Sequence, residues 1–107
     1  MSDTPLDSTV VVGRIETAEA FTEARKPKLA KLTIDLGDRT VRSAAQLLYA
    51  HDVAELPGTR VLCATGLGTV TIAGFESEVL TLGVPDEDGN PVLVTPDRDV
   101  PLGGKLY

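Results

Sequence analysis

Residues 30–42 read Ala-Lys-Leu-Thr-Ile-Asp-Leu-Gly-Asp-Arg-Thr-Val-Arg. The first seven residues alternate between apolar and polar side chains, a pattern that is typical of a strand with one buried face. The apolar members of that face are Ala30, Leu32, Ile34 and Leu36. Gly37-Asp38 then predicts a turn into a second strand at residues 39–42. The stretch therefore predicts a β-hairpin and indicates an all-β protein.

The chain on either side has the same strand character. Further strands are predicted at 10–15, 60–65, 69–75, 77–84 and 92–94, with a last edge strand in 100–107. Gly13 lies inside the first of them and predicts a bend or a bulge. In the run 77–84, we expect Leu80, Leu82 and Val84 to share the apolar face. The polar segment 85–91 predicts a hairpin loop.

One segment departs from the strand pattern. Ser43-Ala44-Ala45-Gln46 has the spacing of a helix capping box, and Asp52 and Glu55 repeat that spacing before Pro57-Gly58. We therefore expect one or two short helical turns between Gln46 and Leu56. The fold class predicted is an all-β, five-stranded OB-fold barrel with one short helix between strands 3 and 4 and extra C-terminal strands. An immunoglobulin-like sandwich fits less well, because the chain has no tryptophan and no cysteine pair.

Length and composition set the domain organisation. The chain has 107 residues, and Leu, Ile, Val and Phe make up 29% of them, which is enough for one hydrophobic core. We expect residues 1–8 to form a flexible tail and residues 9–107 to form the domain. The first residues resemble no secretory signal, and no apolar run reaches the ~18 residues of a membrane span. A single cysteine favours a reducing compartment.

The charge is unevenly distributed. The net charge is −6, which by itself argues against a nucleic-acid partner. Residues 24–42, however, hold six basic and two acidic side chains, a local net charge of +4, whereas the rest of the chain carries −10. The basic segment is either an anion-binding patch or a pair of solvated strands.

The sequence offers no catalytic or metal-binding constellation. The only histidine, His51, has no nucleophile near it in sequence, and Cys63 lies in an apolar run. Gly66-Leu67-Gly68 lacks the rest of any phosphate-binding fingerprint. The acidic loop 86–90 lacks the terminal glutamate of a calcium loop. We therefore expect no enzyme activity, no cofactor and no metal.

Five motifs follow one another along the chain. The motifs are residues 18–27 (AEAFTEARKP), 32–37 (LTIDLG), 43–46 (SAAQ), 72–83 (IAGFESEVLTLG) and 95–105 (TPDRDVPLGGK). In this order they resemble the CsaA-like group of tRNA-binding-type proteins, and the resemblance covers about residues 9–106. The resemblance implies an OB-fold, a cytoplasmic homodimer without catalytic residues, and binding of tRNA or of unfolded or precursor peptides. The apolar C-terminal residues 102–107 are a candidate edge for pairing with the second protomer.

Candidate ligand residues follow from the matched motifs. The predicted RNA-binding residues are Arg25, Lys26, Lys28, Arg42, Ser43 and Gln46. The predicted peptide-binding or barrel-rim residues are Phe21, Phe75, Ser77 and Glu78. A capping box would equally explain Ser43 and Gln46 without any ligand. Glu78 has the parity of the apolar side chains that follow it, so it needs either a partner or a place at the rim.

The sequence departs from the group at basic positions. Residues at or beside Val11, Tyr49-Ala50, Gly66 and Val70-Thr71 replace basic or polar residues of the family motifs. Each lost cation weakens binding to phosphates. The sequence therefore predicts one of two functions. One is weak binding of tRNA or structured RNA through residues 25–42, and the alternative is a chaperone that binds peptides in an apolar groove. The acidity is also compatible with a high-salt habitat.

Overall fold

The computed structural model describes residues 9–107, and the tail predicted at residues 1–8 lies outside them. Nine strands and one 3-10 turn follow one another in the described chain. Their bounds are β1 Thr9–Ala20, β2 Ala30–Asp35, β3 Thr40–Ala45, η1 Val53–Glu55, β4 Arg60–Thr65, β5 Val70–Ile72, β6 Phe75–Ser77, β7 Leu80–Thr81, β8 Gly83–Pro85 and β9 Pro91–Leu93. No helix among the described residues is long and apolar enough to span a membrane.

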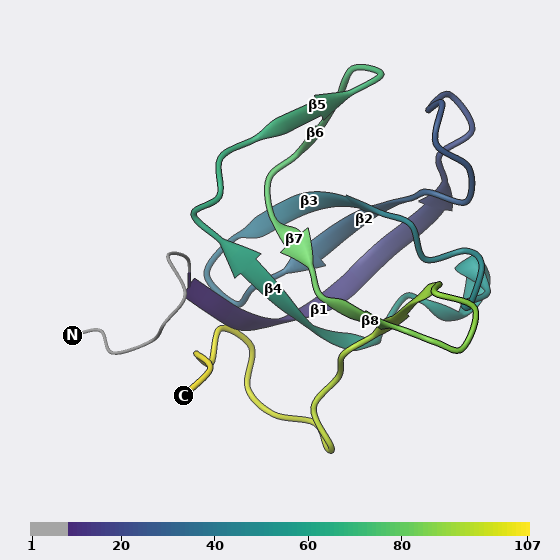
Figure 1. The fold of residues 1–107 in the computed structure, drawn as a ribbon. Coiled ribbons are helices and arrows are strands. Elements are labelled where there is room, and N and C mark those ends of the chain that lie inside the picture. Colours follow the sequence, from purple (N-terminus) through teal and green to yellow (C-terminus); the bar gives the residue numbers. More distant parts are fainter. Residues whose placement is uncertain (1–8) are drawn as a thin grey trace.

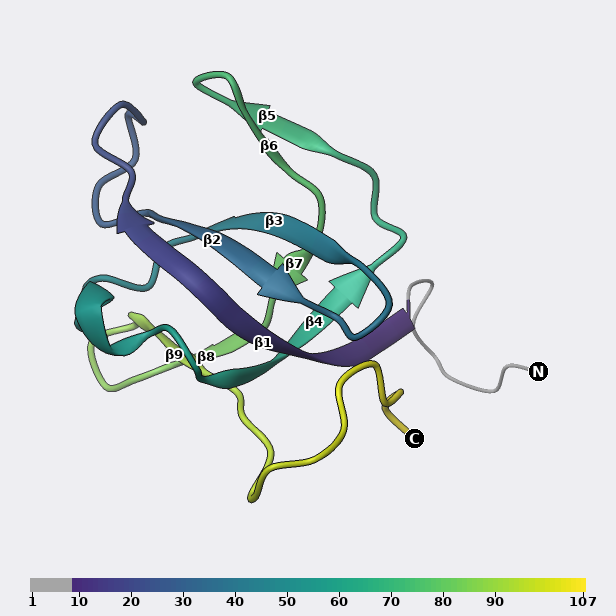
Figure 2. The same ribbon diagram turned by 180° about the vertical axis from the view of Figure 1, so that it is seen from behind.

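A curled five-stranded antiparallel sheet forms the body, in the order β3-β2-β1-β4-β7 (Figure 1). Two small hairpins, β5–β6 and β8–β9, are attached to it. This arrangement, with the short turn η1 between β3 and β4, confirms the predicted all-β, OB-like fold with extra C-terminal strands. Figure 2 shows η1 at one end of the curled sheet, close to the β8–β9 hairpin.

The long strand β1 is the centre of the sheet, because it pairs with β4 through its first half and with β2 through its second half. The register with β2 shifts between Ile15 and Thr17, so the predicted bulge lies three residues beyond Gly13. Gly13 serves a different purpose. A Cβ atom there would lie 2.6 Å from Cγ2 of Ile34, so only glycine allows β2 to approach this closely.

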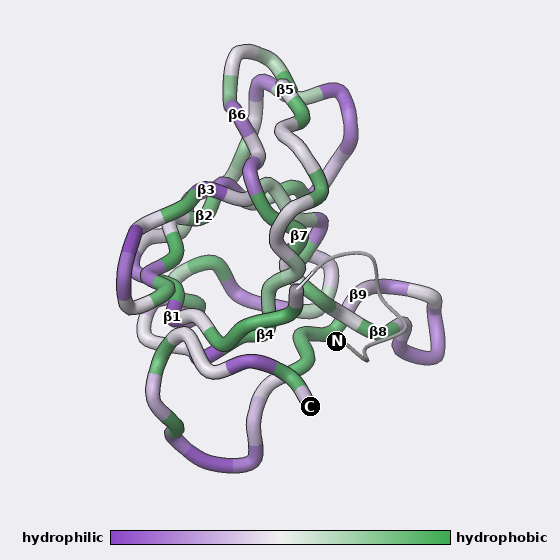
Figure 3. The backbone as a smooth tube through the Cα atoms, turned by 90° about the vertical axis from the view of Figure 1, so that its left-hand side faces the viewer, coloured by the Kyte–Doolittle hydropathy of each residue, from purple (hydrophilic) through white to green (hydrophobic). Residues whose placement is uncertain are grey.

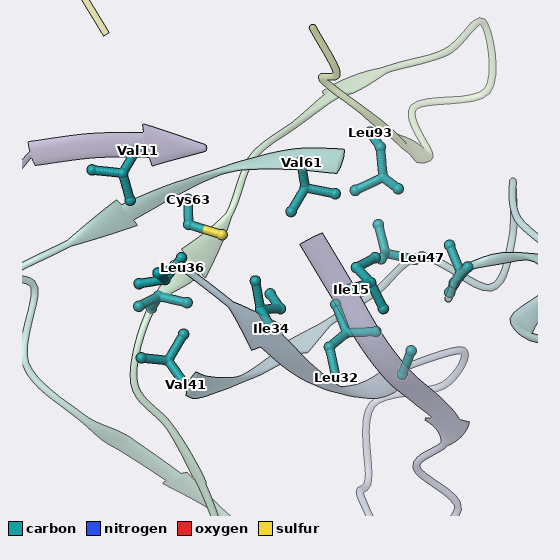
Figure 4. Packing of buried hydrophobic residues seen from close by; sticks show 13 residues of the cluster. Val11, Ile15, Leu32, Ile34, Leu36, Val41, Leu47, Val61, Cys63 and Leu93 are labelled. Carbon is teal, nitrogen blue, oxygen red and sulfur yellow. The ribbon is translucent and has the colours of Figure 1, made fainter. Parts of the chain in front are cut away.

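The core lies inside the curl of the sheet. The buried alternation of β2 is as predicted, and its side chains meet those of β1, β3 and β4 (Figure 4). Among them, Ile15, Ile34 and Val61 are fully buried. Cys63 is buried in the same cluster, and this burial raises the pKa of its thiol to about 11. Cys63 is therefore a protonated core residue at neutral pH.

The predicted strand 69–75 is a hairpin instead. Ala73 and Gly74 both have positive φ angles, 46° and 83°, which turn the chain back so that β5 pairs with β6. A two-residue turn with positive φ at both positions fits the twist of a tight hairpin. The run of β-branched residues concealed the turn in the sequence, because only one of the two turn residues is glycine.

The predicted strand 77–84 is also broken, and its buried face is the opposite one. Val79 and Thr81 are buried, whereas Leu80 and Val84 are 52% and 54% exposed. The chain turns from β6 to β7 to β8 along this stretch, so the larger apolar side chains lie outside the barrel. The alternation indicated strand character but assigned the wrong face to the core, since polar Thr81 finds a buried hydrogen-bond partner.

The capping-box interpretation of Ser43 and Gln46 is wrong, because residues 40–45 form β3. Helical structure is limited to η1 and the turn before it, and Asp52 caps η1 as expected by accepting a hydrogen bond from the Ala54 amide at 3.0 Å. His51 fastens the neighbouring hairpin, since its Nε2 atom accepts a hydrogen bond from the Leu93 amide at 3.2 Å.

The C-terminal segment lies along β1 of its own chain. The amides of Gly103 and Leu106 donate to the carbonyl oxygens of Val12 and Val10, at 2.8 and 2.9 Å. These bonds bear out the predicted last edge segment, although it forms only an isolated bridge. These bonds lie on the side of the segment that faces β1, and the predicted homodimer remains a prediction.

The predicted polar hairpin loop at 85–91 connects β8 and β9. In Figure 3 this connection is hydrophilic, whereas the strands on either side of it are hydrophobic. Asp86 stabilises the loop, because its Oδ1 atom accepts hydrogen bonds from the amides of Asp88 and Asn90, both at 2.9 Å. Within the described part of the chain, no group of three acidic, histidine or cysteine residues is placed to hold a metal ion.

Candidate nucleic-acid and peptide interface

Two projections flank one side of the sheet. The loop between β1 and β2, residues 21–29, and the β5–β6 hairpin extend in the same direction in both Figure 1 and Figure 2. Both lie beside β3, whose residues they approach. The sequence placed the candidate ligand residues on these segments, and the structure brings most of them to this side.

Two aromatic rings join the projections at their bases. Phe21 and Phe75 pack edge to face with their ring centroids 5.5 Å apart. The ammonium of Lys31 lies 5.1 Å from the centroid of Phe21, and the guanidinium of Arg42 lies 5.0 Å from that of Phe75. Cation–π contacts of this kind stabilise a partly exposed site by about 0.5–1 kcal/mol each. The cluster therefore fixes the loop and the hairpin relative to each other.

Carboxylates neutralise both cations of this cluster. Lys31 Nζ lies 3.3 Å from Glu19, and Arg42 Nη2 lies 3.8 Å from Glu76. Exposed pairs of this kind contribute little to stability, but each places a negative charge where a phosphate would otherwise approach. Two of the six cations of the basic segment are thus less available to an anion than the others.

The three cations of the loop, unlike Lys31 and Arg42, are not paired with a described carboxylate. Arg25, Lys26 and Lys28 are exposed, and none of them forms an ion pair with another side chain in residues 9–107. Lys28 also has a positive φ of 62°, a conformation that presents its side chain from a tight turn. The loop therefore concentrates unneutralised positive charge at one edge of the site.

The remaining predicted residues form hydrogen bonds that close the barrel and support the loop. Ser43 is fully buried, donating to the Val79 carbonyl at 3.1 Å and accepting from the Thr81 hydroxyl at 2.8 Å. Gln46 donates to the Pro27 carbonyl at 2.8 Å and so supports the basic loop. Both residues hold the site in place from beneath.

Ser77 and Glu78 serve the same closure from the other strand. Ser77 Oγ accepts from the Ala44 amide at 3.0 Å, and Glu78 Oε1 accepts from the Arg42 amide at 2.8 Å. The Glu78 amide in turn donates to the Arg42 carbonyl. Glu78 is exposed at the rim, which agrees with the rim alternative for this residue. The edge of β3 is therefore joined to the residues before β7 largely by hydrogen bonds to side chains, in place of a regular backbone ladder.

A groove of about 850 Å³ opens where this closure ends. Its walls are the basic loop, β3, the β5–β6 turn and the β7–β8 stretch, and they are mainly apolar. The lining includes Arg25, Lys26, Ala44, Ile72, Leu80 and Leu82. Sequence reasoning missed the two leucines as ligand residues because it assigned them to the core. It also missed Glu19 and Glu76, since no local signal shows which carboxylate lies opposite a cation.

Comparison with known proteins identifies the family of this chain. The family model described as "Putative tRNA binding domain" matches residues 10–105. The chain is 35% identical over 95 residues to the methionine–tRNA ligase of Haloarcula marismortui, and 35% identical over 96 residues to that of Methanococcus maripaludis. The two matches include 89% and 90% of this chain but only 13% and 14% of the length of the two ligases.

Two solved structures resemble the whole domain. The CsaA chaperone of Bacillus anthracis matches with a TM-score of 0.86 and 34% identity, over 94% of this chain and 91% of that one. The CsaA chaperone protein of Picrophilus torridus matches with a TM-score of 0.84 and 35% identity, over 94% and 92%. The chain therefore belongs to the family of putative tRNA-binding domains and is structurally close to the CsaA chaperones.

Proposed function

We propose that the chain binds tRNA, or an RNA of similar structure, through Arg25, Lys26 and Lys28. The observation that supports this most directly is the exposure of these three cations without a carboxylate partner in the described chain. Neutralised phosphates supply most of the affinity for nucleic acid. Membership of the tRNA-binding family supports RNA as the anion. Arg42 is a secondary contact, while Ser43 and Gln46 act by positioning the strand and the loop.

A titration of tRNA at several salt concentrations tests this function. Three phosphate contacts predict a slope of log affinity against log salt of roughly −2 to −3, since each contact contributes about −0.7 to −0.9. All six cations of the segment would give a slope of roughly −4 to −5. Fluorescence anisotropy with labelled tRNA measures the slope. Absence of binding at low salt, or binding that ignores salt, would contradict the proposal.

Glu76→Gln is expected to raise the affinity for tRNA about threefold at low salt. The carboxylate lies 3.8 Å from Arg42 Nη2 and competes with a phosphate for that cation. An exposed pair of this kind is worth about 0.2–1 kcal/mol. A change of this size in the free energy of binding corresponds to a few-fold change in affinity.

The matched control is Glu87→Gln, which removes the same charge from the loop between β8 and β9. It should change the affinity for tRNA by much less than Glu76→Gln. An equal gain from the two variants would show that only the overall net charge matters. Arg42 would then have no place among the contacts.

The apolar lining of the groove favours a second function. We infer that the chain can also act as a chaperone that binds an unfolded or precursor peptide there, as the CsaA resemblance suggests. An apolar groove with a few polar groups at its rim is typical of ligand sites. RNA binding needs the charged loop, whereas peptide binding depends on the apolar walls, so substitutions in the apolar walls distinguish the two functions.

Leu80→Thr is expected to abolish at least half of any protection that the protein gives to an aggregating client. Leu80 lines the groove and is 52% exposed, whereas Val84 is 54% exposed but does not line it. Val84→Thr is therefore the control, with the same residue introduced on the same stretch of chain. Light scattering of reduced α-lactalbumin measures the protection. Equal effects of the two substitutions, or no protection by the parent protein, would contradict a peptide groove.

A further inference from the structure

One strand edge facing the groove has no partner. The Leu82 amide donates to the Leu62 carbonyl at 2.9 Å, and the Leu82 carbonyl accepts from the Val94 amide at 3.1 Å. Leu82 therefore directs its backbone groups to the side of β4 and β9. In an antiparallel ladder the next residues in each direction point the opposite way, so Thr81 and Gly83 direct theirs toward the groove. No other residue in 9–107 forms a backbone hydrogen bond with them on that side.

The facing strand β3 is only partly bonded at the same level. The backbone N–H and C=O groups of Arg42 and Ala44 point away from β2. At the turn, the Leu36 amide donates to the Arg39 carbonyl, and in an antiparallel ladder this bond determines which of the following residues bond to β2 and which point away from it. Both backbone groups of Arg42 are hydrogen-bonded to Glu78, and the Ala44 amide donates to the Ser77 hydroxyl. Ser43 joins β3 to Val79 and Thr81 through its buried hydroxyl, and beyond Ala44 no side-chain hydrogen bond of the described residues bridges the two strands. The sheet thus separates beyond this hydroxyl pair, and Ala44, Thr81 and Gly83 line the groove.

We propose that an extended polypeptide adds as a strand to the edge formed by Thr81 and Gly83. This inference rests on the second proposed function and specifies how its ligand is held. Open backbone groups on alternate residues repeat every 6.6–6.8 Å or so along a strand. Another polypeptide has donors and acceptors at that repeat, and strand addition is a common mode of peptide binding. A nucleotide backbone presents no amide series with this spacing.

The walls of the groove define the class of peptide. Leu80 and Leu82 lie on one face of the open edge and line the groove, so they favour apolar side chains at alternate positions of the ligand. Arg25 and Lys26 at the rim favour an acidic group at one end. The preferred ligand is therefore an extended segment with alternating apolar residues that ends in carboxylates.

Amide hydrogen exchange, followed by NMR, tests the mode of binding. The probe is a fluorescein-labelled peptide of sequence Thr-Val-Thr-Val-Thr-Val-Asp-Asp, whose binding is first measured by anisotropy. At saturation we expect the exchange of the Thr81 and Gly83 amides to slow at least tenfold. The Leu82 amide, already bonded to Leu62, is the internal control and should change by less than twofold. The same peptide with every backbone nitrogen methylated should not bind.

The outcomes separate this inference from the function on which it rests. Binding of the peptide without slower exchange at Thr81 and Gly83 would overturn strand addition but leave a peptide groove. Absence of binding would overturn both. Equal slowing of the two amides by a polyuridine octamer would overturn the assignment to a polypeptide. Slower exchange at these two amides with the peptide alone would support it.

Discussion

Replacing Arg25, Lys26 and Lys28 together by alanine is expected to lower the affinity for tRNA about 30-fold at low salt. Each exposed charge contact contributes about 0.2–1 kcal/mol, so three of them contribute about 2 kcal/mol. The slope of log affinity against log salt should also fall toward zero, by roughly two to three. Anisotropy titrations at several salt concentrations measure both quantities. The fold should not change, because all three side chains are exposed.

The control is a second triple variant with the same change in net charge. Arg39→Ala, Arg98→Ala and Lys105→Ala remove three cations outside the loop, and all three side chains are exposed. This variant should lose only a few-fold in affinity and keep most of the salt slope. If the two triple variants lose affinity equally, the protein attracts RNA by its overall charge, and the basic loop is not the site.

Ser43→Ala is expected to lower the free energy of unfolding by about 2–3 kcal/mol. The substitution leaves the Val79 carbonyl and the Thr81 hydroxyl without their buried partner, and unsatisfied buried groups cost about 1–3 kcal/mol. For a chain of this length, the melting temperature should fall by roughly 10 °C. Urea unfolding and thermal melts measure the two quantities.

Thr65→Val is the matched control for this loss. Thr65 also donates its hydroxyl hydrogen to a backbone carbonyl, that of Thr9 at 3.1 Å, but in an exposed position where water can replace the bond. Thr65→Val should lower the free energy of unfolding by less than about 0.5 kcal/mol. A loss from Ser43→Ala as small as this would mean that the junction between β3 and β7 is not held by the buried hydroxyl pair.

Much of the barrel could be predicted from local sequence. The alternation of residues 30–36 fixed the buried face of β2, and the glycine-containing turn after it was visible in the composition. Residues 85–91 were equally recognisable as a hairpin loop. In each case the signal and the structure lie within a few residues of each other, so no knowledge of distant partners was needed.

The errors arose where a distant partner decides the outcome. Ser43 has capping-box spacing, yet a hydroxyl 38 residues away makes it a buried strand residue. Leu80 looks more suitable for a core than Thr81, but Thr81 can be buried because Ser43 accepts its hydrogen bond. The neutralisation of Arg42 by Glu76 likewise depends on the β5–β6 turn. A single sequence gives the local pattern but not these pairings.

The attachment of residues 103–106 to β1 has a kinetic consequence. Val10 and Val12 lie at the start of the described chain, and their partners lie more than 90 residues later. Contacts between such distant segments slow folding, because a large loop must close before they form. During synthesis on the ribosome, β1 will therefore remain without part of its pairing until almost the whole domain has emerged. The outer side of β1 should acquire protection late in folding, after the sheet itself.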